Sequence, residues 1–322
     1  MRVLVTGGAG FIGTNFVEHL LQRGDAVCSI DIAAPKNNSH RNVYKRVDLL
    51  DRPALTEVLA DFKPTEVVHL GARTDMEQRK GLEHFAANIA GVENLIEAIK
   101  AVGGVRRTIF ASSRLVFDLG YVPRYETDYH ASTLYGQSKT KGEELVRAAP
   151  EAIGTWTIVR PTGIWGPWFG EPYLSFFSLI KKGLYVNPGR KVVRKSYGYV
   201  GNFVHQLQRL LEVEESSVDR KTFLLADYQP VVVADWANQI ATHFGSRPVK
   251  TVPASALRAA AAVGDGLGKF GKRFPMTSFR FNNMVTDMVY DTADTETVVG
   301  PLPFTLEVAT AQTIEWMRQH GH

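Results

Sequence analysis

Short apolar runs alternate with longer amphipathic runs over the first half of the chain. Five runs are rich in strand-forming residues and predict strands: Arg2–Thr6, Ala26–Asp31, Glu66–Leu70, Arg107–Ala111 and Thr155–Arg160. Helical patterns follow or separate them at Phe11–Gln22, Leu82–Lys100 and Tyr135–Ala148. Because strands that alternate with helices form parallel crossovers, we expect an α/β fold with helices on both faces of the sheet.

The alternation becomes looser after Pro161. Aromatic residues and glycines cluster in Gly163–Pro172, and helices are predicted near Tyr173–Lys182 and over the alanine-rich Pro253–Lys269. This part is typical of a smaller, mostly helical domain built from discontinuous segments. We predict a first domain of residues 1–162 with 196–226, and a second of 163–195 with 227–322.

Charge and composition restrict the partners and the location. The 322 residues include 37 Lys and Arg against 33 Asp and Glu, and the basic residues form no long stripe, so we do not expect nucleic-acid binding. A single cysteine, Cys28, cannot form an internal disulfide. Glycines interrupt the apolar start, and no run reaches the ~18 apolar residues of a membrane span. We therefore expect a cytoplasmic protein with no membrane partner.

A glycine-rich turn joins the first strand to the first helix. It reads Thr6–Gly7–Gly8–Ala9–Gly10–Phe11–Ile12–Gly13. Glycines let the backbone approach a pyrophosphate, and the helix N-terminus offers free N–H groups to its oxygens. Strand, turn and helix follow one another as a dinucleotide site requires.

Asp31 ends the second predicted strand, eighteen residues after Gly13. A carboxylate at this place accepts hydrogen bonds from the adenosine ribose and repels a 2′-phosphate. The next residues, Ile32–Pro35, include no arginine that would bind such a phosphate. The preferred cofactor is therefore NAD rather than NADP.

Tyr135 and Lys139 lie four residues apart, on one face of a predicted helix. The lysine ammonium would lower the pKa of the phenol and make it a better base. Ser113, twenty-two residues upstream at a strand end, would hydrogen-bond the reacting oxygen, although a serine there is by itself more typical of a helix cap.

These features, with others along the chain, resemble the extended short-chain dehydrogenase/reductases, a group that contains nucleotide-sugar epimerases, dehydratases and reductases. The other matching motifs are Asp48–Leu49, His69–Leu70–Gly71–Ala72, Asn88-x-x-Gly91-x-x-Asn94, Ser112–Phe117 and Arg160–Pro161. The resemblance implies a Rossmann-type doubly wound parallel sheet in the first domain, which binds the dinucleotide, and a substrate-binding second domain. It also implies a homodimer paired through the helices around 82–100 and 133–148.

The resemblance assigns roles to individual residues. Ser113, Tyr135 and Lys139 would be catalytic. The implied cofactor-binding residues are Gly7, Gly10, Phe11, Ile12, Gly13, Asp31, Ile32, Asp48, Leu49, Leu70, Gly71, Ala72, Asn88, Tyr135, Lys139, Pro161 and Ile164. Ser113, Arg114, Lys195 and Arg280 are the candidate substrate-binding residues, the last two either as cations for a diphosphate or as solvated loop charges. No cluster of His, Cys and carboxylates suggests a metal.

Departures from the family pattern narrow the chemistry. The dehydratases carry an acidic residue directly after the catalytic serine, whereas this chain has Arg114 and Leu115, so dehydration is disfavoured. The hypothesis that remains is an NAD-dependent nucleotide-sugar epimerase acting at C4 through a 4-keto intermediate. The alternatives are a reductase or dehydrogenase of a keto-sugar nucleotide and, from a different class, a non-catalytic dinucleotide sensor.

Overall fold

The chain folds into two compact units. The computed structural model describes residues 1–75, 81–149, 153–269, 274 and 276–322. The first unit comprises Met1–Phe169, Gly198–Tyr228 and Asp291–Phe304. The second comprises Gly170–Tyr197, Gln229–Tyr290 and Thr305–His322. Among the described residues, no helix is long and apolar enough to cross a membrane.

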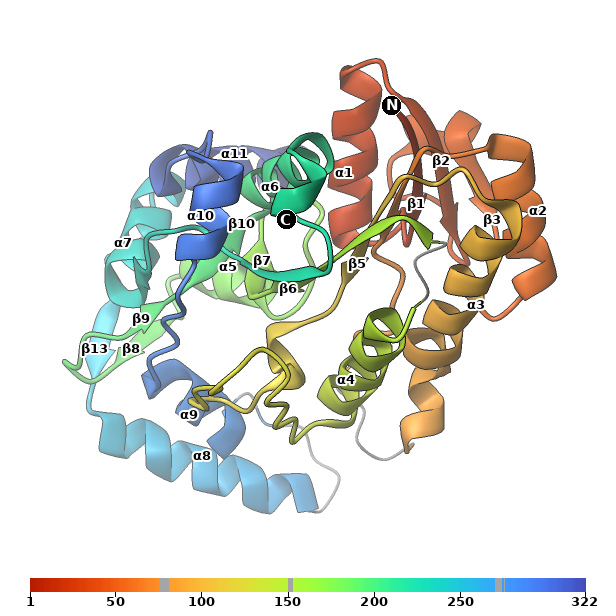
Figure 1. Ribbon diagram of the computed structural model, residues 1–322. Helices are drawn as coiled ribbons and strands as arrows, with labels where there is room; N and C mark the ends of the chain where they lie inside the picture. Colours follow the sequence, from red (N-terminus) through yellow and green to blue (C-terminus); the bar gives the residue numbers. More distant parts are fainter. Residues whose placement is uncertain (76–80, 150–152, 270–273, 275) are drawn as a thin grey trace. The chain divides into compact units, whose positions relative to one another are not determined.

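A seven-stranded parallel sheet forms the centre of the first unit (Figure 1). Its strands are β1 (Arg2–Thr6), β2 (Ala26–Asp31), β3 (Tyr44–Arg46), β4 (Glu66–His69), β5 (Arg107–Ala111), β6 (Thr155–Pro161) and β11 (Lys221–Leu225). They lie in the order β11-β6-β5-β4-β1-β2-β3. The order reverses between β1 and β4, and ligands of open α/β sheets bind outside the carboxyl ends of the strands at such a point.

Helices cover both faces of this sheet. On one face, α2 (Arg52–Phe62), α3 (Ala86–Val102) and α4 (Leu134–Arg147) pack side by side, and α1 (Phe11–Gln22) packs against α6 (Val200–Glu212) on the other (Figure 1). The central strands are therefore buried on both faces, as the full burial of Val3, Leu4 and Val5 shows. Cys28 of β2 lies in this core, and burial raises the pKa of its thiol to about 11. The predicted α/β fold is confirmed.

Residues 163–169, 227–228 and 291–304 belong to the first unit although the predicted division placed them in the second, and residues 196–197 belong to the second although they were predicted in the first. Residues 163–169 contain β7 (Gly163–Trp165), which pairs with β10 (Tyr197–Tyr199). Residues 291–304 contain α10 (Ala293–Val299), which packs on α6 and β11. Thr295 of α10 donates a hydrogen bond to the Leu224 carbonyl at 2.8 Å, and this contact with β11 helps to explain the placement.

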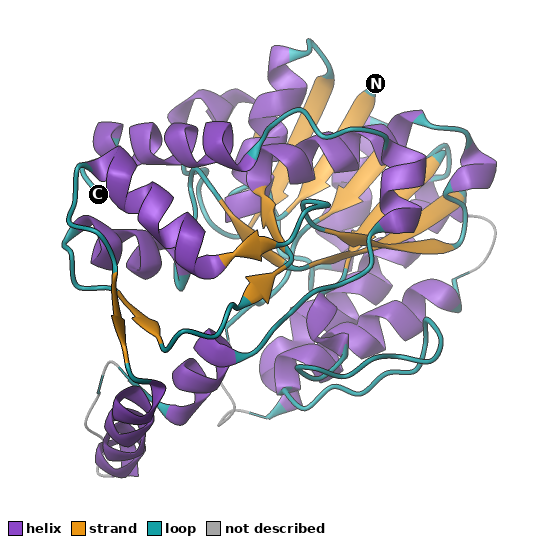
Figure 2. Cartoon of the chain, turned by 90° about the vertical axis from the view of Figure 1, so that its left-hand side faces the viewer, coloured by secondary structure: helices purple, strands orange, loops and turns teal. Residues whose placement is uncertain are grey.

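The second unit is mostly helical (Figure 2). It contains α5 (Tyr173–Lys181), α7 (Val233–Phe244), α8 (Ala254–Lys269), α9 (Ser278–Val285), α11 (Leu306–Gln319), and two strand pairs, β8 (Val186–Pro188) with β13 (Lys250–Val252) and β9 (Arg194–Lys195) with β12 (Val231–Val232). Trp236 of α7 packs against Phe177 of α5 and donates a hydrogen bond to Thr310 of α11. These contacts join three helices around one buried aromatic residue.

Candidate active site

A cavity of about 980 Å³ opens in the first unit at the carboxyl ends of its strands. Segments that follow six of the strands line it, from the glycine turn after β1 to the Pro161–Ile164 segment of β6 and β7. The structure brings together in its wall these sequence-predicted residues: Gly7, Gly10, Phe11, Ile12, Gly13, Asp31, Ile32, Asp48, Leu49, Leu70, Gly71, Ala72, Ser113, Tyr135, Lys139, Pro161 and Ile164. The cavity therefore lies where the reversal of strand order predicts a ligand.

The glycine turn needs its glycines for close backbone contacts. Gly7 has a φ of +70°, and a Cβ there would lie 2.5 Å from the Gly71 nitrogen. A Cβ at Gly13 would lie 2.1 Å from the Gly7 carbonyl oxygen. Gly10 is the N-cap of α1, and no side chain caps that helix. The first-turn N–H groups of α1 are thus available to an anion, and a pyrophosphate fits this donor set.

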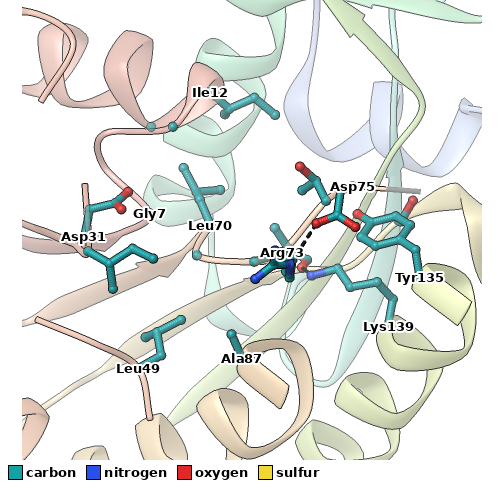
Figure 3. Close-up of a pocket in the computed structure, with 18 of the residues that line it drawn as sticks. Gly7, Ile12, Asp31, Leu49, Leu70, Arg73, Asp75, Ala87, Tyr135 and Lys139 are labelled. Carbon is teal, nitrogen blue, oxygen red and sulfur yellow. Dashed lines mark hydrogen bonds and ion pairs between the residues drawn. The ribbon is translucent and has the colours of Figure 1, made fainter. Parts of the chain in front are cut away.

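Asp31, the last residue of β2, lies beside the glycine turn at one end of the cavity (Figure 3). One carboxylate oxygen accepts a hydrogen bond from the Ala9 N–H at 3.1 Å, and the other accepts from the Ala33 N–H at 3.0 Å. A carboxylate has about four acceptor positions, so further ones remain for ribose hydroxyls. The backbone contacts fix the orientation in which the carboxylate would meet the ribose.

Tyr135 and Lys139 of α4 lie at the opposite end of the cavity (Figure 3). Burial raises the pKa of Tyr135 to about 12, against a hydrogen bond from Ser113 that lowers it. Burial also lowers the pKa of Lys139 to about 8, while the charge of Glu143 raises it. The Lys139 ammonium donates to the Ala111 carbonyl at 2.6 Å. Burial is the larger of the two causes that shift the Tyr135 pKa here, and the expected lowering by Lys139 stays a prediction.

Ser113 caps a turn and also lines the cavity, while its catalytic role stays a prediction. Its hydroxyl accepts a hydrogen bond from the Leu115 N–H at 3.1 Å and so caps the short 3₁₀ turn Arg114–Val116. The same side chain lines the cavity beside Tyr135. Capping fixes the side chain in the orientation from which it reaches the phenol.

A buried ion pair anchors α4 to the sheet. Glu143 of α4 accepts hydrogen bonds from Arg160 of β6 at 2.8 and 2.6 Å, and a third from the Tyr129 hydroxyl at 2.9 Å. Burial alone would raise the pKa of Glu143, but the bonds and charge of Arg160 hold it below its ordinary value. Tyr135 and Lys139 precede Glu143 on the same helix, so the pair fixes their position relative to β6.

Asn88 is not among the residues that line the cavity, although it was expected to bind the cofactor. Its carbonyl oxygen accepts from the Arg73 N–H at 2.7 Å, and its amide donates to the Arg73 carbonyl and to Ser138. Ser138 in turn donates to the Tyr135 carbonyl at 2.7 Å. Asn88 thus fastens the segment after β4 to α4.

Three candidate substrate residues also lie elsewhere than in the cavity wall. Arg114 is buried and donates to the carbonyls of Phe117 and Asp118 at 2.8 and 2.9 Å, which directs its guanidinium into its own loop. Lys195 belongs to the second unit, where its buried ammonium donates to Asn283. Arg280 is exposed on α9 of the same unit. A role in substrate binding stays a prediction for the last two.

Four charged or ionisable residues of the cavity wall were not singled out from the sequence: Arg73, Asp75, Glu83 and His84. Arg73 and Asp75 belong to an irregular segment after β4, which has no periodicity. The other two lie in a 3₁₀ turn, Leu82–Phe85, which the helical pattern had merged with α3. Among the described residues, no group of three His, Cys, Asp or Glu side chains is placed to hold a metal ion.

Comparison with known proteins places the chain in a family. A model described as the NAD dependent epimerase/dehydratase family matches residues 3–225. The chain belongs to this family. NAD is the cofactor named in the family's description, in agreement with the prediction from the glycine turn and Asp31.

The relatives differ in chemistry. The chain is 30% identical to a 3β-hydroxysteroid dehydrogenase/Δ5→4-isomerase of Mycobacterium tuberculosis, over 76% of this chain and 70% of that protein. It is also 30% identical to UDP-glucuronate 4-epimerase 4 of Arabidopsis thaliana, over 73% of this chain and 62% of that protein. The crystal structure of UDP-glucose 4-epimerase from Thermotoga maritima has a TM-score of 0.77 at 21% identity, covers 100% of both chains, and shows a common fold.

Proposed function

We propose that this chain is an NAD-dependent epimerase that inverts C4 of a nucleotide-linked sugar through a 4-keto intermediate. The observation that carries the proposal is the cavity, in which Gly7 of the glycine turn and Asp31 occupy one end and Tyr135 and Lys139 the other, with Ser113 beside Tyr135. A dinucleotide bound along it would have its adenosine at Asp31 and its reactive ring beside Tyr135. The 4-epimerases among the relatives support this choice of reaction.

The side chains supply the proton chemistry. The glycine turn and Asp31 would hold NAD, which would supply reversible hydride transfer at C4, and inversion would require the hydride to return to the opposite face of the sugar. Tyr135 would take the proton of the 4-hydroxyl group as the carbonyl forms and give it back when the alcohol is restored. Ser113 would donate a hydrogen bond to the same oxygen in both directions. Because burial raises the pKa of Tyr135 to about 12, we expect turnover to increase with pH above neutrality.

The residue after Ser113 supports epimerisation over dehydration. A dehydratase needs an additional acid that protonates the departing hydroxyl group, and the position after Ser113 holds Arg114. The structure directs that arginine to the Phe117 and Asp118 carbonyls and not to the cavity. Arg114 does not give up its proton and does not point to the cavity, so it does not suit the role of this acid.

The test begins with the cofactor and the substrate together. Freshly purified, dialysed protein is denatured and the released dinucleotide is quantified, and the native protein is incubated with UDP-glucose while its C4 epimer is measured. We expect near-stoichiometric NAD, formation of the epimer, and a loss of at least about 10²-fold in turnover in Tyr135→Phe. Tyr125→Phe, an exposed tyrosine outside the cavity wall, serves as the control. Full turnover by Tyr135→Phe would refute the mechanism.

A second candidate is a dehydrogenase that exchanges its cofactor in each cycle. The Mycobacterium tuberculosis relative is itself a dehydrogenase/isomerase, and the same three side chains serve a one-way hydride transfer. Protein that is purified without dinucleotide, binds NAD reversibly and forms NADH with an alcohol substrate would favour this function over epimerisation.

A further inference from the structure

Asp227, the second residue after β11, joins three segments of the first unit that are distant in the sequence. Both of its carboxyl oxygens lie 3.2 Å from the Tyr199 N–H nitrogen, and one accepts from the Asn202 side-chain amide at 2.9 Å. The same Asn202 amide accepts from the Phe304 N–H at 3.0 Å and donates to the Phe304 carbonyl at 2.9 Å. These four residues, which we call the latch, connect the end of β10, the first turn of α6 and the end of the 291–304 segment.

The latch lies behind the wall of the cavity. Ile164 of the wall belongs to β7, which pairs with β10. Gly198 of β10 is packed so closely that a Cβ there would lie 2.6 Å from the Ile164 side chain and 3.4 Å from the Cα of Ala226, the residue before Asp227. A change in the latch can therefore reach Ile164 through β10, because no spare room separates them.

The carboxyl group of Asp227 has no cation beside it in the part of the chain that the structure describes. Its hydrogen-bond partners are the backbone N–H of Tyr199 and the neutral amide of Asn202. An ionised carboxylate that is withdrawn from water without a cation is costly, whereas a neutral carboxyl keeps an acceptor oxygen for these donors. Burial accordingly raises the pKa of Asp227 to about 7, although the bonds from Asn202 and Tyr199 lower it. The charge of the latch therefore changes near neutral pH.

The other titratable groups around the latch differ from Asp227 in their response to pH. Burial is the main cause that raises the pKa values of Tyr199 and Tyr228 to about 12, and the charge of Asp227 contributes to both. The carboxylate of Glu296, on α10, also raises the pKa of Tyr228. His205 lies on α6, and burial lowers its pKa. A buried histidine gains its charge as the pH falls and a buried carboxyl gains its charge as the pH rises, so the two groups predict opposite pH dependence.

We propose that Asp227 makes the latch pH-sensitive: its neutral carboxyl holds β10, α6 and the 291–304 segment together behind Ile164, and its ionisation loosens them. When the latch opens, the carboxyl becomes hydrated and loses its proton more readily than in the closed latch, so opening releases a proton and becomes easier as the pH rises. The folded-state pKa of Asp227 is raised, so the stability that the neutral carboxyl gives is complete in acid and is lost as the pH rises to about 7. Above that pH the carboxyl is ionised in both states, and the effect does not increase further.

Hydrogen exchange of the Tyr199 and Phe304 amides, corrected for the intrinsic rate at each pH and measured where reclosing is faster than exchange, gives the opening constant of the latch. In the wild type we expect this constant to increase by up to about tenfold per pH unit from about pH 5 to about pH 7 and then to level off. Asp227→Asn, which is neutral at every pH, should show no such slope. Asp294→Asn, which alters an exposed carboxyl of the same segment, should keep the wild-type slope. Saturating NAD should lower the opening constant of the wild type, because the closed wall binds it better.

A wild-type opening constant that does not change with pH, or a slope that Asp227→Asn retains, would overturn the role of Asp227. Opening that increases as the pH falls and loses this dependence in His205→Gln would overturn it as well, since the histidine would then be the responsive group. No effect of NAD on opening would overturn the coupling to Ile164. Thermal unfolding checks that Asp227→Asn is folded. If it is not, NMR titration of the aspartate carboxyls in the wild type decides, because a buried group with a midpoint near 7 supports the proposal and midpoints all near about 4 overturn it.

None of these measurements needs a sugar substrate. Failure of the proposed epimerase reaction would therefore leave the test of the latch valid, and failure of the latch would leave the reaction of Tyr135 unaffected.

Discussion

Asp31 carries the charge that would choose between the two nicotinamide dinucleotides. Its oxygens are oriented by the N–H groups of Ala9 and Ala33. We expect Asp31→Ser to weaken NAD binding about tenfold, because bonds to a charged acceptor are lost, and to improve NADP binding relative to NAD, because repulsion of the 2′-phosphate is removed. Fluorescence titration with both dinucleotides measures this.

The control for that experiment is Asp48→Ser, a second carboxylate of the cavity wall, which is expected to leave the ratio of NAD to NADP affinity nearly unchanged. An Asp31→Ser protein that kept the wild-type ratio would show that another group rejects NADP.

Candidate site residues that belong to a local sequence pattern could be predicted. Those that depend on contacts between separate segments could not. Tyr135 and Lys139 were recognisable because four residues is one helical turn. Asp75 of the cavity wall is held by hydrogen bonds with Arg73 and His84. The segment that carries Arg73 and Asp75 has no periodic pattern, so the sequence did not reveal these contacts. Arg114 was misplaced because the direction of its side chain depends on the carbonyls that its own loop presents, which no spacing reveals.

At the scale of the element, α4 is held in place by the ion pair of Glu143 with Arg160, eight residues after Tyr135 on the same helix. Glu143→Ala would leave the guanidinium of Arg160 buried without its carboxylate, which costs about 3–5 kcal/mol of unfolding free energy. Chemical denaturation of the variant measures this loss. Glu144→Ala on the same helix, where the residue is exposed, should change stability by less than about 0.5 kcal/mol. Equal effects in the two variants would show that the ion pair does not anchor the helix.

The bounds of helices and strands were predicted best where the hydrophobic pattern is regular. The bounds of β1, α1, β2 and β5 agree with the sequence patterns because buried parallel strands are short apolar runs between turns. The predicted helix from residue 82 instead begins as a 3₁₀ turn and becomes α3 at Ala86. Helical periodicity does not distinguish these two, since both place apolar residues three or four positions apart.

At the scale of the whole molecule, the resemblance predicts a dimer. Helices α3 and α4 pack side by side, so two copies of the pair would make a four-helix interface. We expect light scattering to give the mass of two chains for the wild type and of one chain for Ile89→Asp, which places a charge on the partly exposed face of α3. A wild-type mass of one chain would contradict the prediction.

The burial of Cys28 has a practical consequence for studying the two units. Thiol-reactive labels attack the thiolate, and a thiol with a pKa of about 11, 3% exposed inside β2, offers very little of it at neutral pH. The natural chain has no other cysteine. A cysteine introduced on an exposed helix of each unit would therefore accept a fluorophore selectively while Cys28 stayed unmodified. Energy transfer between the two dyes would then report whether the distance between the units changes when dinucleotide and substrate are added.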